Sequence, residues 1–244
     1  MSESKPAPYY DRDGITIYCG DAMQIIPHLK KIGAVIVDPP YSSGGNFRSD
    51  RQQATTTKYV QSGSQLYRPE FSGDSRDQRS FLSWCSMWLS RCKSVSCSGA
   101  SVMCFSDWRQ LPTLTDAIQI AGWSWRGLAT WWKPGIRMQS GSFSHSAEYV
   151  VHGTNGPHKR KGSHAQNVFK CAPVGVKGKE HIAEKPLEVM HWLMSLIPDK
   201  AIVLDPFAGS GTTLIAAKQL GNPAIGIEIE ERYCAMAVKR LKRV

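Results

Sequence analysis

The chain has 244 residues, of which 41% are hydrophobic and 20% charged, so its length suits one compact domain with one sizeable core. No run approaches the ~18 consecutive apolar residues of a membrane span, and the N-terminal residues lack a signal peptide's apolar stretch, which argues against membrane and secreted classes. The seven cysteines are odd in number and form no CxxC pair, as expected of reduced thiols in a cytoplasm.

The charge of the chain is basic and unevenly distributed. Lys and Arg number 30 against 20 Asp and Glu, which gives a formal net charge of +10. Residues 126–179 hold nine basic residues and one acidic residue, Glu148, and so carry most of the surplus. A basic surplus can be an ordinary solvated surface, but its concentration in one segment favours a polyanionic partner, with nucleic acid as the first candidate.

Hydrophobic patterning predicts alternating strands and helices along most of the chain. Short apolar runs that end at an acidic residue or a turn are typical of buried parallel strands, and apolar stripes at helical spacing are typical of helices that pack on a sheet. In chain order we expect a strand at 34–37, a helix at 81–93, strands at 102–105, 128–132 and 148–151, a helix at 186–197, a strand at 201–204, a helix at 212–220, a strand at 224–229 and a helix at 230–243. This order predicts a single α/β domain, residues 1–244, with a doubly wound, mostly parallel sheet.

Two polar segments do not fit this pattern. Residues 42–80 are rich in Gly, Ser and Gln, residues 153–180 are basic, and neither segment shows helical or strand periodicity. Loops of this length are uncommon unless they are functional or disordered. Both segments are therefore expected to be functional or mobile loops.

The sharpest chemical signal is Asp38-Pro39-Pro40-Tyr41, directly after the first predicted strand. Ligand sites of open α/β sheets lie at such strand ends. The two prolines remove two backbone donors, so the turn offers carbonyl acceptors beside the Asp38 carboxylate and the Tyr41 ring. These acceptors suit the exocyclic amino group of a planar base, which offers two donors, while the ring can stack on the base.

A second motif, Asp205-Pro206-Phe207-Ala208-Gly209-Ser210-Gly211-Thr212-Thr213, follows the strand at 201–204. Its glycines let a ligand approach the backbone, and the next helix begins with unpaired N–H groups. Glu228 lies 19 residues after Gly209, close to the ~20 expected of an acid that binds ribose hydroxyls. Since the motif lacks the lysine of a P-loop, it predicts a nucleoside ligand without a long phosphate tail. A nicotinamide dehydrogenase would share these features but would leave the motif at Asp38 unexplained.

Both motifs resemble those of the S-adenosylmethionine-dependent DNA amino-methyltransferases, which methylate adenine N6 or cytosine N4. That family's catalytic motif is Asp, Asn or Ser, then two prolines and an aromatic residue, and its cofactor motif is close to residues 205–212 here. The order of the motifs resembles the permuted beta group, and weaker flanking matches occur at Gly20-Asp21, Trp132-Lys133-Pro134, Glu148-Tyr149 and residues 181–186. The resemblance spans roughly residues 15 to 240 and implies a Rossmann-like methyltransferase fold with a small basic target-recognition insertion.

The resemblance also implies roles for the catalytic motif. Asp38 and the Pro39 carbonyl would accept hydrogen bonds from the target amino group, and Pro40 belongs to the same stiff turn. Tyr41 would stack on a base flipped out of the duplex, because a paired base is out of reach. S-adenosylmethionine would be the methyl donor and S-adenosylhomocysteine the product, by direct displacement without a covalent enzyme intermediate or a metal.

For the cofactor, the resemblance implies that Asp205, Phe207, Gly209 and Gly211 line the methionine half. Glu228 would bind the ribose hydroxyls.

Four further cofactor residues have alternative interpretations. Thr212 and Thr213 would cap the helix or touch the cofactor carboxylate. Asp21 would lie near the cofactor's adenine or be an ordinary turn residue. Lys185 would pair with the cofactor carboxylate or be a solvated lysine.

DNA recognition is expected in residues 133–180, where the beta group keeps its target-recognition region. The residues expected to contact DNA, mainly its phosphates, are Lys133, Arg137, Lys159, Arg160, Lys161 and Lys170. Residues 42–80 are expected to form a DNA-facing or mobile loop.

Several alternatives remain open at this stage. Cytosine N4 fits the same acceptors, but Asp38 favours adenine N6, since cytosine-N4 enzymes more usually carry Ser there. RNA and protein amide methyltransferases usually carry Asn at that position, and no cysteine follows a proline as in cytosine-C5 enzymes. A DNA-binding protein with a degenerate cofactor site is the rival from another class. The expected partner is double-stranded DNA in a bacterial or phage-infected cytoplasm, with a homodimer and a cognate restriction endonuclease left open.

Overall fold

The computed structural model describes residues 6–41, 76–136, 140–141, 143–158, 164–175 and 185–244. The strands are β1 (Tyr10–Arg12), β2 (Ile15–Cys19), β3 (Ile32–Val37), β4 (Ser96–Ser106), β5 (Ser124–Trp132), β6 (Ala147–Thr154), β7 (Val168–Lys170), β8 (Ile202–Asp205) and β9 (Ala224–Glu228). The helices are α1 (Ala22–Ile25), the 3-10 helix η1 (Ile26–His28), α3 (Gln78–Val95), α4 (Leu111–Ile120), α5 (Leu187–Met194), α6 (Thr212–Gln219) and α7 (Glu231–Leu241).

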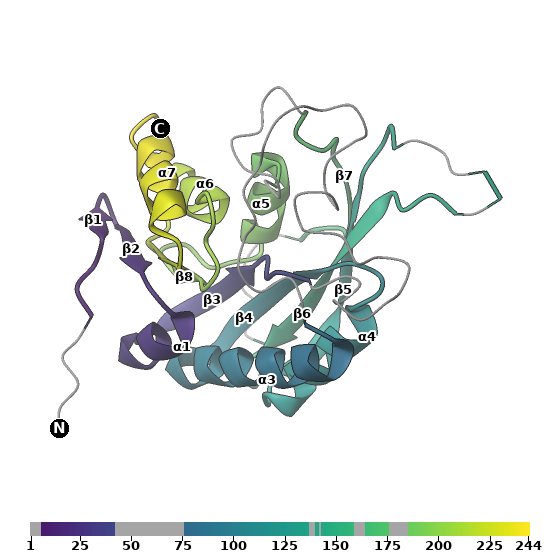
Figure 1. The fold of residues 1–244 in the computed structure, drawn as a ribbon, viewed down its shortest axis with the longest axis horizontal. Coiled ribbons are helices and arrows are strands. Elements are labelled where there is room, and N and C mark those ends of the chain that lie inside the picture. The colour runs from purple at the N-terminus through teal and green to yellow at the C-terminus, as the bar shows by residue number, and fades with distance from the viewer. Residues whose placement is uncertain (1–5, 42–75, 137–139, 142, 159–163, 176–184) are drawn as a thin grey trace.

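The strands form one nine-stranded sheet in the order β1-β2-β9-β8-β3-β4-β6-β5-β7. Five of the eight strand pairings are parallel, and the antiparallel ones are β1 with β2, β4 with β6 and β5 with β6. Helices α1, α3 and α4 cover one face of the sheet, and α5, α6 and α7 cover the other (Figure 1). The prediction of a doubly wound, mostly parallel α/β sheet is confirmed.

The apolar run of β3 is continuous because both of its faces are buried. Ala34 and Ile36 belong to the hydrophobic cluster that contains α5, α6 and α7. Val35 and Val37 belong to the cluster that contains α3 and α4. Side chains alternate between the two faces of a strand, so a strand covered on both sides needs apolar residues at every position.

The helices that follow β3 and β8 in the sequence lie on opposite faces of the sheet, and this places the site. After β3 the chain passes through α3 to β4, whereas after β8 it passes through α6 on the other face to β9. The two strands pair in parallel, with Val35 opposite Leu204, so their carboxyl ends lie side by side. Ligands of open α/β sheets bind in the crevice outside such a reversal of strand order. Asp38 follows β3 and Asp205 ends β8, so both motifs meet at this crevice.

The structure corrects some of the predicted boundaries. The polar segment expected to extend to residue 80 ends earlier, because α3 begins at Gln78, where the Asp77 side chain accepts hydrogen bonds from the backbone of Arg79 at 2.8 Å and Ser80 at 3.0 Å. Residues 42–75 of that segment lie outside the described ranges.

Strands β1, β2 and β7 and helices α1, η1 and α4 were not predicted from the sequence. Strands β1 and β7 have three residues each, too few to show periodicity, and β2 is recognisable only through its pairing with β9. Within the described ranges, no helix combines the length and the apolar character needed to span a membrane.

A first prediction concerns the core beneath the glycine motif. Trp88 of α3 is fully buried, whereas its neighbour Met87 is 52% exposed. We expect Trp88→Ala to lower the free energy of unfolding by about 3–5 kcal/mol, because it leaves a cavity, and Met87→Ala by less than about 0.5 kcal/mol. Urea unfolding measures both, and equal losses for the two variants would contradict the described packing.

Candidate active site

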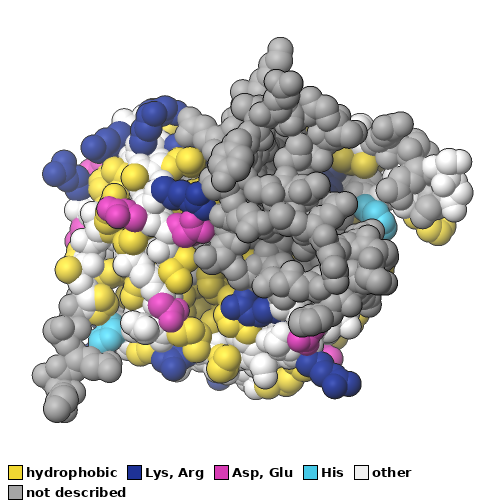
Figure 2. Space-filling model, viewed as in Figure 1, with side chains coloured by type: hydrophobic (Ala, Val, Ile, Leu, Met, Phe, Trp, Pro, Cys, Tyr) yellow, Lys and Arg dark blue, Asp and Glu magenta, His cyan; other side chains and the backbone are white. Residues whose placement is uncertain are grey.

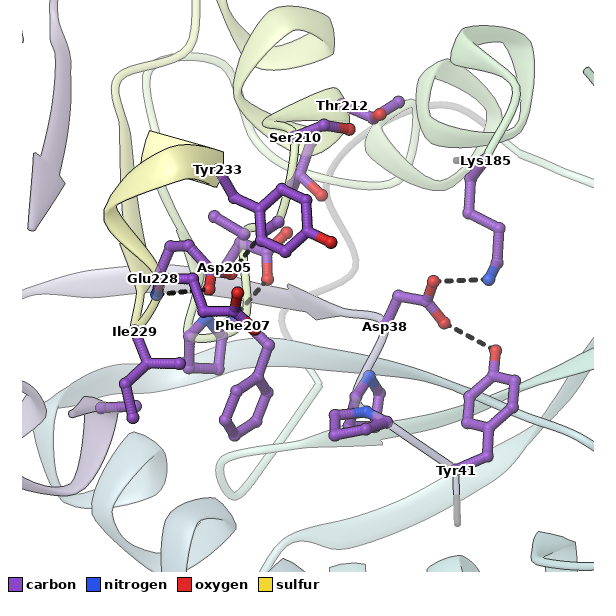
Figure 3. A pocket seen from close by; sticks show the side chains of 18 of the residues that line it. Asp38, Tyr41, Lys185, Asp205, Phe207, Ser210, Thr212, Glu228, Ile229 and Tyr233 are labelled. Carbon is purple, nitrogen blue, oxygen red and sulfur yellow. Dashed lines mark hydrogen bonds and ion pairs between the residues drawn. The ribbon is translucent and has the colours of Figure 1, made fainter. Parts of the chain in front are cut away.

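The carboxyl ends of β3 and β8 open into one pocket with a volume of about 740 Å³. Residues of both motifs line it, and Figure 3 shows them on opposite sides, with Asp38 and Tyr41 facing Glu228 and Tyr233 across the cavity. The predicted site residues that line the pocket are Asp21, Asp38, Pro39, Pro40, Tyr41, Lys133, Lys185, Asp205, Phe207, Gly209, Thr212, Thr213 and Glu228. Just under half of the residues that line the pocket were therefore predicted from the sequence, Lys133 as a DNA contact and the others as catalytic or cofactor residues.

Both oxygens of the Asp38 carboxylate already accept a hydrogen bond. The Tyr41 hydroxyl donates to Oδ1 at 2.6 Å, and the Lys185 ammonium donates to Oδ2 at 2.5 Å (Figure 3). Lys185 was expected to pair with the cofactor carboxylate or to be solvated. The solvated alternative is wrong, because the side chain is buried and its partner here is the carboxylate of the first motif, whereas pairing with the cofactor carboxylate stays a prediction.

Glu148 of β6 is a member of this site that sequence reasoning missed. Its Oε1 accepts a hydrogen bond from Lys133 Nζ at 3.0 Å, and its Oε2 lies 3.3 Å from both Lys185 Nζ and the Tyr41 hydroxyl. Two signals were available: Glu148 is the one acid in a basic segment, and Glu148-Tyr149 resembles a flanking motif of the family. Lys133, expected to contact DNA, instead turns inward: its side chain is 15% exposed and ion-paired with Glu148.

Burial and pairing act in opposite senses on these charges. Burial raises the pKa of Asp38 and outweighs the lowering effect of Lys185, so its net pKa lies above the ordinary aspartate value. Burial also raises the pKa of Glu148, but the nearby Lys185 and Lys133 outweigh it and the net pKa is lowered. Burial lowers the pKa of Lys185, but Asp38 and Glu148 raise it by more. The net pKa lies above the ordinary lysine value, so Lys185 stays charged.

On the other side of the pocket, residues 205–212 form a tight turn, here called the glycine loop. The Gly209 N–H donates to Glu228 Oε2 at 2.9 Å, and the Glu230 N–H donates to Oε1 at 2.9 Å. Gly209 has φ +49°, and a Cβ built there would meet nothing within 4 Å. The backbone at Gly209 is therefore open to a ligand in the pocket.

Gly211 has a different role from the one expected. It does not line the pocket, and with φ +83° a Cβ there would lie 2.8 Å from Ala237 Cβ of α7. Glycine is needed at this position because of the left-handed backbone and the close approach of α7. The structure therefore assigns Gly211 to packing of the loop rather than to lining the pocket.

Arg240 of α7 holds the glycine loop from below. Its buried guanidinium donates through Nη1 to the Ser210 carbonyl at 2.9 Å and the Ser210 hydroxyl at 2.8 Å, and lies 3.3 Å from Thr212 Oγ1. In the sequence, Arg240 is one of several basic residues at the end of a helix, where they complement the helix dipole. Its position in the chain gave no sign of this contact.

Asp205 is a buried carboxylate at the start of the glycine loop. Its Oδ1 accepts from the Phe207 N–H at 3.1 Å, and Thr213 hydrogen-bonds its side chain. Burial raises the pKa of Asp205 to about 7, against the lowering effect of these bonds. The Phe207 ring packs on Trp84 and Trp88 of α3, with ring centroids 5.1 and 5.4 Å apart.

Asp21 is a turn residue that also lies at the pocket, and its place near the cofactor's adenine stays a prediction. It caps α1 through a hydrogen bond from the Met23 N–H at 2.8 Å, and it also lines the pocket. The preceding Gly20 donates its N–H to the Glu228 carbonyl at 2.9 Å, so this turn is joined to the strand that carries Glu228.

Of the other residues expected to contact DNA, Lys170 is described and exposed. Its Nζ lies 5.0 Å from the centroid of the Trp132 ring, which is 43% exposed. Figure 2 shows another group of Lys and Arg side chains over the C-terminal end of α7, where Lys239, Lys242 and Arg243 are exposed. The predictions for Arg137, Lys159, Arg160 and Lys161 lie outside the described residues.

The two glycines of the loop give a second prediction. We expect Gly211→Ala to lower the free energy of unfolding by about 2–4 kcal/mol, because backbone strain adds to a clash with Ala237. Gly209→Ala meets only the backbone strain, about 1 kcal/mol. Urea unfolding of both variants tests the assignment, which fails if Gly209→Ala is the more damaging.

Asp205 gives a third prediction, on stability against pH. The pKa of Asp205 is about 7 in the folded chain and close to the ordinary 3.8 in the unfolded chain, so the folded state binds the proton more tightly. The contribution of Asp205 to the free energy of unfolding is therefore fully present below about pH 4 and is lost as pH rises through about 7. Asp205→Asn keeps the acceptor for the Phe207 N–H and cannot ionise. Its Tm relative to the wild type should therefore rise by several degrees between pH 5 and pH 8, whereas a constant difference would contradict the raised pKa.

Comparison with known proteins agrees with this geometry. The model of the DNA methylase family, which covers N6 and N4 methyltransferases, matches residues 32–239. The type II methyltransferase M.ScaI of Streptomyces caespitosus is 23% identical over 279 aligned positions, covering 96% of this chain and 84% of the relative. M.HindIII of Haemophilus influenzae is 33% identical over 143 positions, which cover 55% of this chain and 38% of the relative.

Solved structures share the fold. The M1.HpyAVI–SAM complex superposes with a TM-score of 0.68 at 24% identity, covering 93% of this chain and 98% of that one. The cytosine-N4-specific PvuII DNA methyltransferase superposes with a TM-score of 0.73 at 15% identity, covering 96% of this chain and 89% of that one. This chain belongs to the N6/N4 DNA methylase family, whose enzymes use S-adenosylmethionine as methyl donor.

Proposed function

We propose that this chain methylates the N6 amino group of adenine in double-stranded DNA. The observation that carries the proposal is the Asp38 carboxylate at the end of β3, which shares one pocket with the glycine loop. Asp38 and the Pro39 carbonyl offer two acceptors beside the Tyr41 ring, and an exocyclic amino group offers two donors to match them.

The chemistry requires positioning more than a strong base. An amino nitrogen on a base shares its lone pair with the ring, so two acceptors that hold both N–H groups direct the lone pair out of the ring plane. S-adenosylmethionine supplies an electrophilic methyl group on a sulfonium. Asp38 and Pro39 would hold the amino nitrogen in line with that methyl group, and Tyr41 would stack on the base after it has left the duplex.

The other half of the pocket fits this cofactor. A ribose diol and an amino-acid ammonium are hydrogen-bond donors, and this side of the pocket presents the carboxylates of Glu228 and Asp205. The open Cβ direction at Gly209 leaves room for a ligand against the backbone. These features support Glu228 as the partner of the ribose, and Asp205, Phe207 and Gly209 as the wall of the methionine half.

Adenine is preferred to cytosine on the identity of residue 38. Asp is more usual in adenine-N6 enzymes of this family and Ser in cytosine-N4 enzymes. The acceptor geometry itself suits both amino groups, and the cytosine-N4-specific PvuII enzyme has the same fold. Cytosine N4 is therefore the second candidate, and the experiment below distinguishes the two.

DNA contact is proposed for residues 133–180, with Lys170, Arg137 and residues 159–161 binding phosphates. The type II relatives support a cognate restriction endonuclease as the biological partner, in the cytoplasm of a bacterial or phage-infected cell. A homodimer is the remaining partner proposal, for which the elution volume of the purified protein is a direct test.

The test is nucleoside mass spectrometry of DNA from a bacterial host that lacks DNA methyltransferases and expresses this chain. We expect N6-methyladenine with the wild type and a loss of at least about 100-fold with Asp38→Ala, because the amino group is no longer positioned. Calorimetry should show that Asp38→Ala still binds S-adenosylmethionine. The matched control is Asp116→Ala, an exposed acid on α4, which should methylate normally.

The possible outcomes separate the candidates. N4-methylcytosine in place of N6-methyladenine would agree with the mechanism but show that the target base is cytosine. Normal methylation by Asp38→Ala would overturn the site, and unmethylated DNA from a host with folded wild-type protein would overturn the function.

A further inference from the structure

Lys185 occupies the place that the proposed function assigns to the substrate. Its side chain is 8% exposed, and its ammonium donates to Asp38 Oδ2. Tyr41 takes the other oxygen, so the described structure leaves neither Asp38 oxygen free of a donor. Each oxygen can accept a second hydrogen bond, but Lys185 and Tyr41 already hold both of them, so an incoming amino group competes with these two donors for Asp38.

The two donors differ in what displacement would cost. A hydroxyl is neutral, whereas a buried ammonium that loses its only carboxylate is strongly destabilised. Lys185 has a second carboxylate within reach, since Glu148 Oε2 lies 3.3 Å from Nζ. The rings of Tyr41 and Phe105, with centroids 5.4 and 5.1 Å from Nζ, favour a cation in the same place.

Glu148 is fixed in position to receive that charge. Its other oxygen is held by Lys133 at 3.0 Å, and β6 pairs with β4 and β5 on either side. Asp38, Glu148 and Lys185 come from three separate parts of the chain, the end of β3, strand β6 and the segment before α5. The ammonium thus sits between two carboxylates and needs only a small shift to pass from one to the other.

We propose that Lys185 stands in for the target amino group while no base is bound, and that Glu148 takes over its ammonium when the base enters. This inference rests on the proposed function. Lys185 keeps its three protons throughout, no covalent bond changes, and one N–H donor on Asp38 is exchanged for another. Lys185 and Glu148 are positioning residues, because both act through Asp38 rather than on the reacting atoms.

The arrangement has an electrostatic signature. The groups that face Asp38 are Lys185 before α5, Tyr41 in its own turn, Glu148 on β6, Cys104 on β4 and Asp205 at the end of β8. Lys185 lowers the pKa of Asp38 and Glu148 raises it. Removing the charge of Lys185 should therefore raise the pKa of Asp38, and removing the charge of Glu148 should lower it.

The experiment is the pH dependence of single-turnover methyl transfer from tritiated S-adenosylmethionine to unmethylated plasmid DNA, with Lys185→Met and Glu148→Gln. In Lys185→Met the acidic limb should move up by about 1–3 pH units, because an opposite charge at this range lowers a carboxylate pKa by that amount. In Glu148→Gln it should move down. The matched controls are Lys30→Met and Glu188→Gln, both exposed and outside the pocket lining, which should leave the limb in place.

The Michaelis constant for DNA gives an independent readout. Glu148→Gln should raise it about tenfold, since Lys185 then has no second carboxylate to move to and resists displacement. Lys185→Met should lower it, because the acceptor is already vacant. In Lys185→Arg, which keeps the positive charge, the acidic limb should lie at the same pH as in the wild type. Calorimetric binding of S-adenosylmethionine confirms that each variant is folded.

Limbs that stay in place or move in the same direction, or an unchanged Michaelis constant for Glu148→Gln, would overturn the inference. A wild type that transfers no methyl group to DNA would instead overturn the proposed function. In that case the carbon-13 resonance of the Asp38 carboxyl, titrated without DNA, still tests the pairing. It should give the same opposite shifts in the two variants, and equal midpoints would overturn the inference.

Discussion

The parallel pairing of β3 with β8 is the constraint on which the site depends. The residues that end these strands are far apart in the sequence, yet the pairing brings Asp38 and Asp205 to one edge of the sheet. Helix α3 follows β3 on one face of the sheet and α6 follows β8 on the other, and the pocket lies at the carboxyl ends of these two strands. The single pocket that both motifs line is a direct result of this reversal of strand order.

The second half of the pocket depends on tight packing behind the glycine loop. Gly211 lets the loop approach Ala237, and the buried Arg240 side chain donates hydrogen bonds to the carbonyl and hydroxyl of Ser210. This support leaves the Gly209 backbone and the Glu228 carboxylate facing the cavity. Burial raises the pKa of Asp38, Asp205 and Glu228 together, so the pocket is rich in acceptors that gain from a bound hydrogen-bond donor or cation.

The sequence predicted the parts of the structure that are encoded locally. Continuous apolar runs predicted β3, β8 and β9, and two motifs placed Asp38 and Gly209 in the site, because strand ends and glycine turns are recognisable over a few residues. Three sets of contacts could not be predicted in this way. They are the ion pairs of Glu148, the ion pair between Lys185 and Asp38, and the hydrogen bonds from Arg240 to the glycine loop. Each depends on which strand or helix lies beside which, and that follows from strand order rather than from the neighbouring residues.

The most direct test of the central claim, that one pocket serves both motifs, is a crystal structure of the chain with bound S-adenosylmethionine. The account predicts the ribose on Glu228, the methionine half against Gly209 and Asp205, and the sulfonium methyl group directed at Asp38. A cofactor bound outside this pocket, or one whose methyl group points away from Asp38, would contradict it.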